Sequence, residues 1–164
     1  MSSSREISNI YKDCYLIDSL NRIFEENRNK RICVVATSCA GKSTLLHSFK
    51  EALDMDDELF PLLTKEESDY VCGYPWTEEI GDFMDNLAKS KLKIVPGHPL
   101  FGTVVLDADI IAFLHIDEKI LKSRCLKRKA NFKNSLNMQR KIEEDLERYK
   151  DKVIKLEMSD DTRV

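Results

Sequence analysis

Residues 36–44 read Ala-Thr-Ser-Cys-Ala-Gly-Lys-Ser-Thr, and this stretch decides how the rest of the chain is interpreted. It follows an apolar, β-rich run at 31–36, typical of a buried strand, and leads into a helical pattern at 43–53. It matches the Walker A pattern GxxxxGK[ST] except at Ala36, where the first glycine is usual; alanine serves there if its φ is negative. Because strand, turn and helix follow one another as the pattern requires, the sequence predicts a loop that binds the phosphates of a nucleoside triphosphate.

Each part of this loop has an expected role. The backbone N–H groups of residues 39–43 are expected to surround the β-phosphate, and Lys42 to reach the β- and γ-phosphates. The Ser43 hydroxyl is expected to bind Mg²⁺, and Thr44 to lie near the α-phosphate. ATP and Mg²⁺ are therefore the predicted ligands. The expected nucleotide-binding residues are Ala36, Thr37, Ser38, Cys39, Ala40, Gly41, Lys42, Ser43 and Thr44.

Length, charge and composition exclude several other classes of protein. A chain of 164 residues suits a single domain with one proper core. A net charge of −3 disfavours a nucleic-acid polymer as partner, and no apolar run approaches the ~20 residues that cross a membrane. The first residues lack the pattern of a signal peptide. The five cysteines form no CxxC pair and have no histidine at zinc-ligand spacing. We expect a cytoplasmic monomer or homodimer without disulfides or zinc.

Strand-like and helix-like patterns alternate along the chain. Strands are predicted at 31–36, 91–95, 109–116 and 153–158, and helices at 5–27, 43–53, 77–90, from 118 to about 128, and from 138 to about 149. Residues 54–75 fit neither pattern. The alternation predicts an α/β fold of three layers with a mainly parallel, five-stranded sheet, as one domain over residues 1–164. Helix 5–27 is expected to extend this domain by packing on the sheet, with a dimer interface as the alternative. Residues from about 129 to 138 are expected to form a small lid loop.

The distal half of the chain narrows the class further. The guanine-binding NKxD pattern and the LSGGQ pattern of transport ATPases are absent. A predicted strand ending Phe-Leu-His-Ile at 113–116 is followed by Asp117 and a helix that carries Arg124 and Arg128 ahead of the lid. Together with residues 36–44, this resembles the P-loop kinases of the adenylate kinase and shikimate kinase group. The resemblance implies a P-loop NTPase fold, and arginines that pack on adenine and clamp phosphates when the lid closes. It covers about half of the chain and leaves the acceptor side uncovered.

The two arginines are also favoured by the chemistry of phosphoryl transfer. That reaction accumulates negative charge on non-bridging oxygens, so it is catalysed by positioning and by fixed positive charge. Arg124 and Arg128, four residues apart, share one helix face and can point at one ligand. We expect both to act with Lys42 in catalysis; the alternative is a solvated basic surface. The same region is enriched in further cations, Lys127, Lys129, Lys133 and Arg140.

The metal-binding and catalytic carboxylates have less specific signals. Asp107 ends the apolar run Val-Val-Leu at 104–106 in the manner of a Walker B strand, so it is expected to bind Mg²⁺ with Ser43. Asp109 is an alternative, and both could merely cap a turn. Asp56, within Asp-Met-Asp-Asp at 54–57, resembles the DxD of shikimate kinase and is the candidate catalytic base. Against it, the helix predicted at 43–53 leaves no second strand to hold these carboxylates, and an acidic turn is the alternative.

The acceptor pocket is expected where strands end. In open α/β sheets ligands bind at the carboxyl ends of strands, so Gly97 and His98, after the predicted strand at 91–95, are candidate substrate-binding residues. Tyr74 and Trp76 could stack on a ring, although core or lid packing is the alternative. The expected function is phosphoryl transfer from Mg·ATP to a nucleotide, nucleoside or small hydroxylated metabolite. The alternative is a nucleotide-binding sensor or regulatory module that has no small-molecule acceptor.

Overall fold

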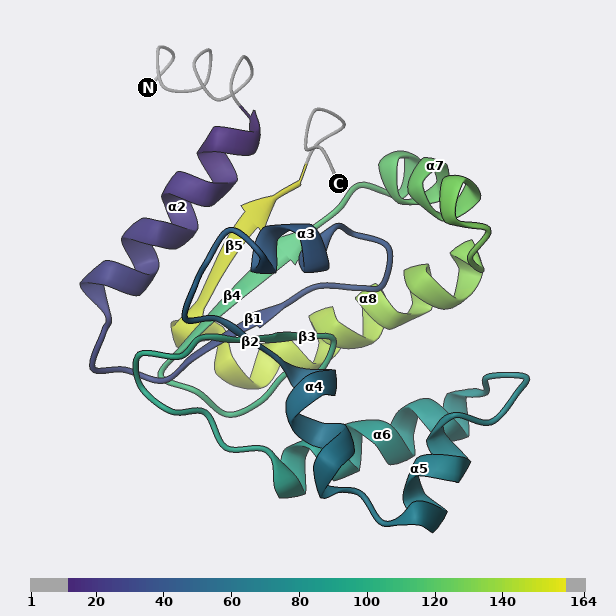
Figure 1. The fold of residues 1–164 in the computed structure, drawn as a ribbon. Coiled ribbons are helices and arrows are strands. Elements are labelled where there is room, and N and C mark those ends of the chain that lie inside the picture. Colours follow the sequence, from purple (N-terminus) through teal and green to yellow (C-terminus); the bar gives the residue numbers. More distant parts are fainter. Residues whose placement is uncertain (1–11, 159–164) are drawn as a thin grey trace.

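A sheet of five parallel strands lies at the centre of the molecule (Figure 1). The computed structural model describes residues 12–158. The strand order is β2-β3-β1-β4-β5, and every neighbouring pair is parallel. The strands are β1 (Ile32–Val35), β2 (Leu53–Asp54), β3 (Leu100–Gly102), β4 (Ile110–His115) and β5 (Val153–Glu157). The predicted α/β class with a five-stranded parallel sheet is confirmed.

Helices cover both faces of this sheet, because side chains alternate between the two faces along each strand. On β1, Val34 belongs to one core cluster, whereas Cys33 and Val35 belong to the other. The first face is covered by α2 (Lys12–Glu26), α3 (Lys42–Leu46) and α7 (Glu118–Arg128). The second is covered by α4 (Met55–Leu59), α5 (Lys65–Val71), α6 (Glu78–Lys91) and α8 (Phe132–Leu146). The expected three layers are therefore present.

The predicted N-terminal helix packs on the sheet, as expected. Leu16, Leu20 and Ile23 of α2 are buried in the core of the first face. Residues 5–11 of that predicted helix lie outside the described residues. Across residues 12–158, no helix combines the length and the apolar character that crossing a membrane requires.

Of residues 54–75, which fit neither sequence pattern, Asp54 ends β2 and the rest begin a helical segment between β2 and β3. This segment, residues 55–91, contains α4, the 3₁₀ helix η1 (Phe60–Leu62), α5 and α6. Thr64 begins α5 with a reciprocal capping box, in which its hydroxyl accepts from the Glu67 N–H and Glu67 bonds the Thr64 N–H. The helix predicted at 77–90 is confirmed as α6, and the Thr77 hydroxyl caps it by accepting from the Ile80 N–H at 3.2 Å.

The strand predicted at 91–95 is wrong. Helix α6 continues to Lys91, and the chain then turns at Gly97, whose φ is 89°. Pro96 and Pro99 have no N–H to donate to a strand ladder. The segment that pairs with β1 comes later, as the fully buried β3. Residues that precede β3 therefore lie at its amino end, not at its carboxyl end.

Two further element boundaries also differ from the predictions. Helix α3 ends at Leu46 rather than near residue 53, which leaves room for β2. The lid loop expected at 129–138 is wrong for most of its length, because α8 begins at Phe132. Lys129, with φ 56°, ends α7, and the Asn131 side chain caps α8 by accepting from the Asn134 N–H. The 3₁₀ helix η2 (Glu147–Lys152) joins α8 to β5.

Candidate active site

The loop at 36–41 leaves the carboxyl end of β1, the central strand of the sheet. Strand β1 lies between β3 and β4, where the chain's connections diverge to the two sides of the sheet, and this is where open α/β sheets bind ligands. The Ala36 N–H donates to the Gly102 carbonyl at 3.1 Å, which extends the pairing of β1 with β3. Ala36 has no positive φ, so alanine meets the condition that the sequence set for it. The left-handed turns fall at Cys39, with φ 66°, and Gly41, with φ 100°.

Groups from α7 and α8, one of them a backbone carbonyl, form hydrogen bonds with this loop. The Thr37 hydroxyl donates to the Ser135 carbonyl, and the hydroxyls of Ser38 and Ser135 are hydrogen-bonded at 2.6 Å. On the other side, the Arg124 guanidinium donates to the Ala40 carbonyl. Arg124 is only 8% exposed, which is rare for a charged side chain that is not well bonded. The loop backbone is therefore fixed by groups from two other elements, as a site with preorganised geometry requires.

Lys42 and Asp56 face each other across the carboxyl end of the sheet. Lys42, the first residue of α3, is half-buried and lies within electrostatic reach of Asp56 at the start of α4. Asp54 ends β2 and accepts from the Asp56 N–H at 2.7 Å, which fixes the turn from strand to helix. The objection that no second strand holds these carboxylates is thereby removed, because the short α3 leaves room for β2. Ser43 and Thr44 follow Lys42 and are exposed.

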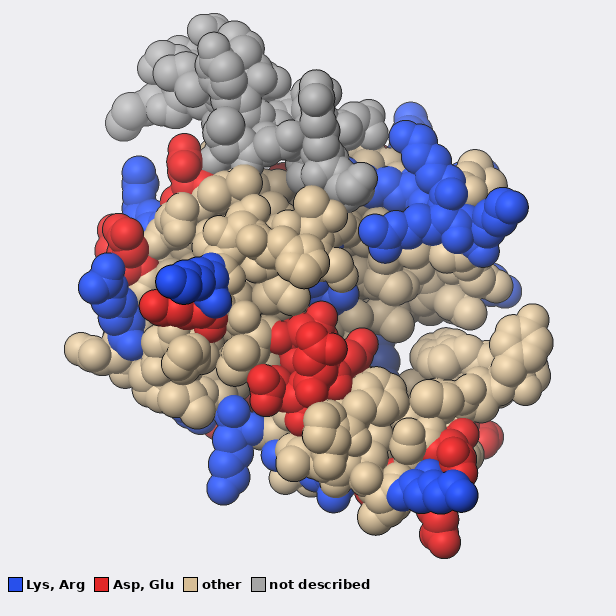
Figure 2. Space-filling model, viewed as in Figure 1, with Lys and Arg blue, Asp and Glu red and all other residues tan. Residues whose placement is uncertain are grey.

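The electrostatic surroundings of Asp56 are those of a candidate base. Desolvation raises the pKa of Asp56, the neighbouring Asp54 carboxylate raises it further, and the Lys42 ammonium lowers it. The Asp56 side chain is exposed to ligands, and its raised pKa makes it a stronger proton acceptor than an aspartate with the ordinary pKa. Figure 2 shows acidic side chains gathered over the start of α4, and Lys and Arg side chains over α7. Opposite charges thus lie on the two sides of the loop.

The two candidate arginines differ in their surroundings. Arg124 is buried and bonds to the loop, whereas Arg128, one turn later on α7, is exposed. Arg128 lies within electrostatic reach of the Cys125 thiol, whose pKa is raised by burial first and partly lowered by Arg128. Arg140, expected to strengthen the same basic region, instead pairs with Glu118 at 3.5 Å.

Asp107 and Asp109 lie at the opposite edge of the sheet from the loop. Asp109 accepts from the N–H of Arg31, which precedes β1, at 2.8 Å. That bond, with the Arg31 side chain, lowers the pKa of Asp109. Asp107 lies 3.6 Å from the Nζ of Lys152, which precedes β5. Because all strands are parallel, residues before the strands share the edge opposite to Ser43. The structure therefore does not bring Asp107 to Ser43, and Thr103, not a carboxylate, follows β3.

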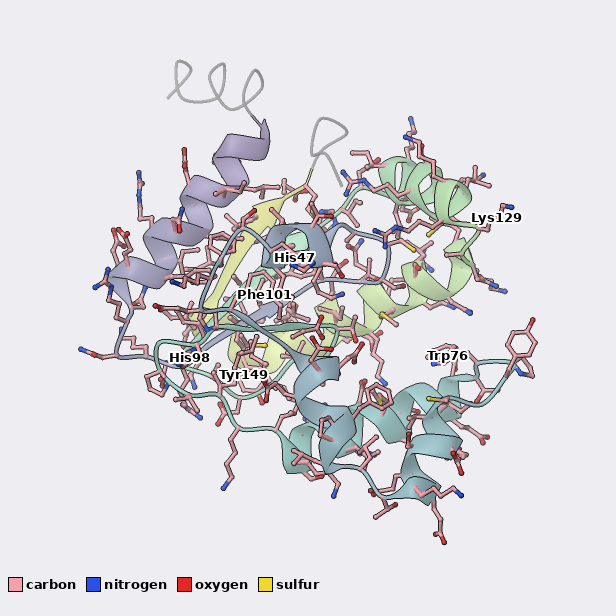
Figure 3. All side chains as sticks on the ribbon, viewed as in Figure 1. His47, Trp76, His98, Phe101, Lys129 and Tyr149 are labelled. Carbon is pink, nitrogen blue, oxygen red and sulfur yellow. The ribbon has the colours of Figure 1, made fainter. Side chains whose placement is uncertain are left out.

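The candidate acceptor residues Gly97 and His98 lie at that opposite edge too. His98 Nδ1 is 3.0 Å from the carbonyl of Glu51, which precedes β2. In Figure 3, His98 and Trp76 are at opposite ends of the molecule. Gly97 and His98 would lie at the carboxyl end of a strand only if residues 91–95 formed that strand. They do not, and the strand that forms, β3, begins after His98.

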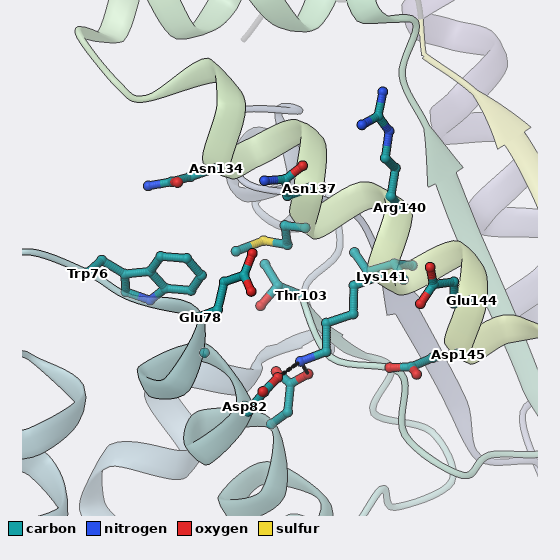
Figure 4. A pocket seen from close by; sticks show the side chains of 14 residues that line it. Trp76, Glu78, Asp82, Thr103, Asn134, Asn137, Arg140, Lys141, Glu144 and Asp145 are labelled. Carbon is teal, nitrogen blue, oxygen red and sulfur yellow. Dashed lines mark hydrogen bonds and ion pairs between the residues drawn. The ribbon is translucent and has the colours of Figure 1, made fainter.

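A cleft of about 480 Å³ opens between α6 and α8, on the carboxyl side of the sheet (Figure 4). Thr103 forms part of its wall, directly after the Gly102 whose carbonyl bonds to Ala36. Its volume is within the range of small-molecule sites. The lining residues are Trp76, Glu78, Gly81, Asp82, Asp85, Thr103, Asn134, Asn137, Met138, Arg140, Lys141, Ile142, Glu144 and Asp145.

The sequence reasoning considered Trp76 but missed the other walls of this cleft. Asn134 and Asn137 lie in the stretch that was expected to be a lid loop. The available signal was Asn131, a strong N-cap residue that places both asparagines, three residues apart, on one face of a helix. Asp54 was visible within the DxD pattern. No signal in the sequence pointed to Thr103.

Lys141 joins the two helices that border the cleft. It pairs with Asp82 and, at 2.9 Å, with Asp85, both on α6. Desolvation raises the pKa of Asp85, and the bond to Lys141 offsets part of that rise. Desolvation lowers the pKa of Lys141, but its bonds to Asp82 and Asp85 outweigh this and the net shift is upward.

The donor atoms near the loop indicate which kind of metal ion the site could hold. Within residues 12–158, no group of three or more His, Cys, Asp and Glu side chains is arranged to hold a metal. Magnesium at nucleotide sites needs no such cage, since it is bound through one or two protein ligands, phosphates and water. The Ser43 hydroxyl and the Asp54 and Asp56 carboxylates are oxygen donors of this kind.

In comparisons with known proteins, the chain matches no family model and shows no significant match to a curated protein.

Proposed function

We propose that the protein is an ATP-dependent phosphotransferase with the P-loop NTPase fold, which transfers a phosphoryl group to the hydroxyl of a small acceptor. The observation that carries this proposal is the loop at 36–44, which stands between β1 and α3 at the switch point of a parallel sheet. The nearby Lys42 and Asp56 add a cation and a base. A nucleotide sensor would need the loop alone.

The cations have distinct roles in this proposal. Lys42 stabilises negative charge that develops on the transferred group, and its position next to the loop supports this. Arg124 is a positioning residue, because its guanidinium bonds to the Ala40 carbonyl. Arg128 is exposed at the end of α7 and is free to reach a bound nucleotide by side-chain rotation. Only Lys42 and Arg128 are thus assigned as catalytic cations.

Asp56 is the proposed base. Its carboxylate accepts the proton of the acceptor hydroxyl as that oxygen bonds to the γ-phosphorus, and ADP leaves when the bond between the β- and γ-phosphates breaks. A Mg²⁺ ion bound by Ser43, with Asp54 or Asp56 through water, would supply charge neutralisation at the phosphates. The raised pKa of Asp56 favours proton transfer.

A thermal-shift panel tests the proposal. The protein is heated with Mg²⁺ and a non-hydrolysable ATP analogue, alone and with nucleosides, nucleoside monophosphates and cyclic polyols. A phosphotransferase is stabilised by the analogue, and one acceptor adds about 1–3 kcal/mol only when the analogue is present. Compounds that stabilise are then tested with ATP for the phosphorylated product and ADP. Stabilisation by nucleotide alone, with no product from any acceptor, would instead support the sensor.

A further inference from the structure

We propose that the cleft between α6 and α8 binds the acceptor, and that it selects an uncharged hydroxyl compound with a planar ring, of the nucleoside class, over phosphorylated compounds. This inference rests on the proposed function and names the substrate class for the same site. It is carried by three features of the cleft: one aromatic wall, two side-chain amides and an excess of carboxylates.

The aromatic wall is Trp76, held flat against α6 by a glycine. A Cβ atom at Gly81 would lie 2.6 Å from Cζ2 of the Trp76 ring, closer than any side chain tolerates. The ring therefore lies directly on the helix backbone, and it remains 39% exposed on the side of the cleft. A flat, supported and partly open indole is a surface on which a planar ring can stack.

Two asparagines face Trp76 from α8. Asn134 and Asn137 project from one side of the helix toward the cleft, with Trp76 across from them (Figure 4). Among the described residues, neither side-chain amide has a hydrogen-bond partner. An amide carries both donors and an acceptor, as the edge of a nucleobase does, so the pair can bond a ring stacked on Trp76. The face of the bound ring would thus contact Trp76, and its edge would bond to the two asparagines on the opposite wall.

The charge of the lining disfavours a phosphate on the acceptor. Five lining residues are acidic, namely Glu78, Asp82, Asp85, Glu144 and Asp145, against two basic ones, Arg140 and Lys141. Both cations already contact carboxylates: Lys141 pairs with Asp82 and Asp85, and Arg140 with Glu118. Lys89, which is not a lining residue, pairs with Asp145 at 3.8 Å, and the five lining carboxylates still outnumber the two lining cations. A phosphorylated acceptor would be repelled by this excess of negative charge, whereas an uncharged nucleoside would not.

The cleft is also placed for transfer. Ser135, between Asn134 and Asn137 in the sequence, bonds to Thr37 and Ser38 of the loop. Thr103, at the base of the cleft, follows the residue that bonds to Ala36. The cleft and the loop at 36–41 are therefore joined through α8 and through the end of β3.

The experiment uses the tryptophan itself as a reporter. Trp76 is the single tryptophan of the chain, so its fluorescence reports the cleft directly. The full chain, with Mg²⁺ and a non-hydrolysable ATP analogue, is titrated with adenosine, guanosine, cytidine and thymidine, with their 5′-monophosphates and with a cyclic polyol. We expect a nucleoside to quench the fluorescence and its monophosphate to bind at least tenfold more weakly. A monophosphate that binds as tightly, a polyol that binds better, or no response to any nucleoside would overturn the inference.

Three variants distinguish a loss of stacking on Trp76 from a general effect on folding. Trp76→Leu, assayed by calorimetry, is expected to lose about tenfold in nucleoside affinity, which is the effect of removing one stacking partner. Tyr74→Leu is the matched control, because Tyr74 is in the same loop and 98% exposed, and it should bind normally. Gly81→Ala should displace the ring and weaken binding similarly without unfolding α6. Equal affinity in Trp76→Leu and wild type contradicts the inference. Failure of the ATP analogue to bind would contradict the proposed function instead.

Discussion

The proposed base, Asp56, can be tested by changing one residue. Asp56→Asn keeps the shape of the side chain and removes the charge, so turnover should fall by about 10²–10⁴-fold with little change in ATP affinity. Because the pKa of Asp56 is raised, wild-type activity should be lost as the pH falls through a value above the ordinary 3.8 of aspartate. The measurement is kcat/KM against pH. Asp57→Asn, in the same helical turn, is the control, and an Asp56→Asn variant with full activity would exclude Asp56 as the base.

Substitution of Arg124 is expected to lower stability, whereas substitution of Arg128 is expected to lower only the turnover rate. Arg124→Met leaves the Ala40 carbonyl without its charged donor, so the free energy of unfolding should fall by about 1–3 kcal/mol and the KM for ATP should rise. Arg128→Met removes an exposed side chain, so stability should be unchanged while kcat falls. Denaturant unfolding and steady-state kinetics measure both effects. Equal stability of the two variants would contradict a positioning role for Arg124.

At the scale of single elements, the start of α8 depends on its cap. Asn131→Ala removes the bond from the Asn131 side chain to the Asn134 N–H and should destabilise the protein by about 1 kcal/mol. Asn134→Ala is the matched control, because the Asn134 side chain makes no such bond and alanine favours helix, so this variant should be neutral or slightly stabilising. The midpoint of urea unfolding reports the difference. If Asn131→Ala has no effect, residues 132–138 do not begin a helix as described.

Strand β3 and helix α4 are packed so closely that only glycine fits between them. A Cβ atom at Gly102 would lie 2.1 Å from the sulfur of Met55, which is buried. Gly102→Ala should therefore destabilise by about 1–3 kcal/mol through overpacking. Adding Met55→Ala should recover part of that loss, so the two substitutions should be non-additive in a double-mutant cycle. Strict additivity would show that the two side chains do not compete for the same space.

The elements that could be predicted from the sequence are those with a clear period or a specific local signal. The apolar run of β1, the Walker A pattern and the Thr77 and Asp117 caps act locally, so their positions could be derived. The position of β3 could not be derived, because its three residues become a strand only by pairing with β1. The run at 91–95 resembles a strand in the sequence, but two prolines follow it. The same error moved Gly97 and His98 to the wrong edge. β2 was hidden because α3 ends after five residues, although its helical pattern continues.

The position of the loop at 36–41 could be predicted from the sequence, whereas the cleft between α6 and α8 could not. Lys42 and Ser43 belong to one contiguous motif, whereas the cleft is built from α6 and α8, with Trp76 before α6 and Thr103 after β3, which are far apart in sequence. The prediction that Asp107 lies near Ser43 is wrong for a related reason. It requires the apolar run at 104–106 to be a strand that ends at Asp107. Residues 103–109 are not in a strand.

For the whole molecule, the parallel sheet brings both halves of the proposed site to one edge. The loop after β1, the carboxylates after β2 and the cleft wall after β3 all lie at carboxyl ends of strands. The helices bordering the cleft are joined by Lys141, with Asp82 and Asp85 on α6. If nucleotide and acceptor bind as proposed, each should stabilise elements that the other contacts, so we expect their binding to be cooperative.

The most direct test of the central claim is calorimetric titration of the full chain with a non-hydrolysable ATP analogue and Mg²⁺, in wild type and in Lys42→Ala. Lys50→Ala, an exposed lysine beyond α3, is the matched control. We predict that the wild type and Lys50→Ala bind alike. Lys42→Ala should bind at least tenfold more weakly with an unchanged Tm, because Lys42 is proposed to bind the phosphates and is not part of either core cluster. Equal affinity of Lys42→Ala and wild type would contradict the assignment of residues 36–44 as a phosphate-binding loop.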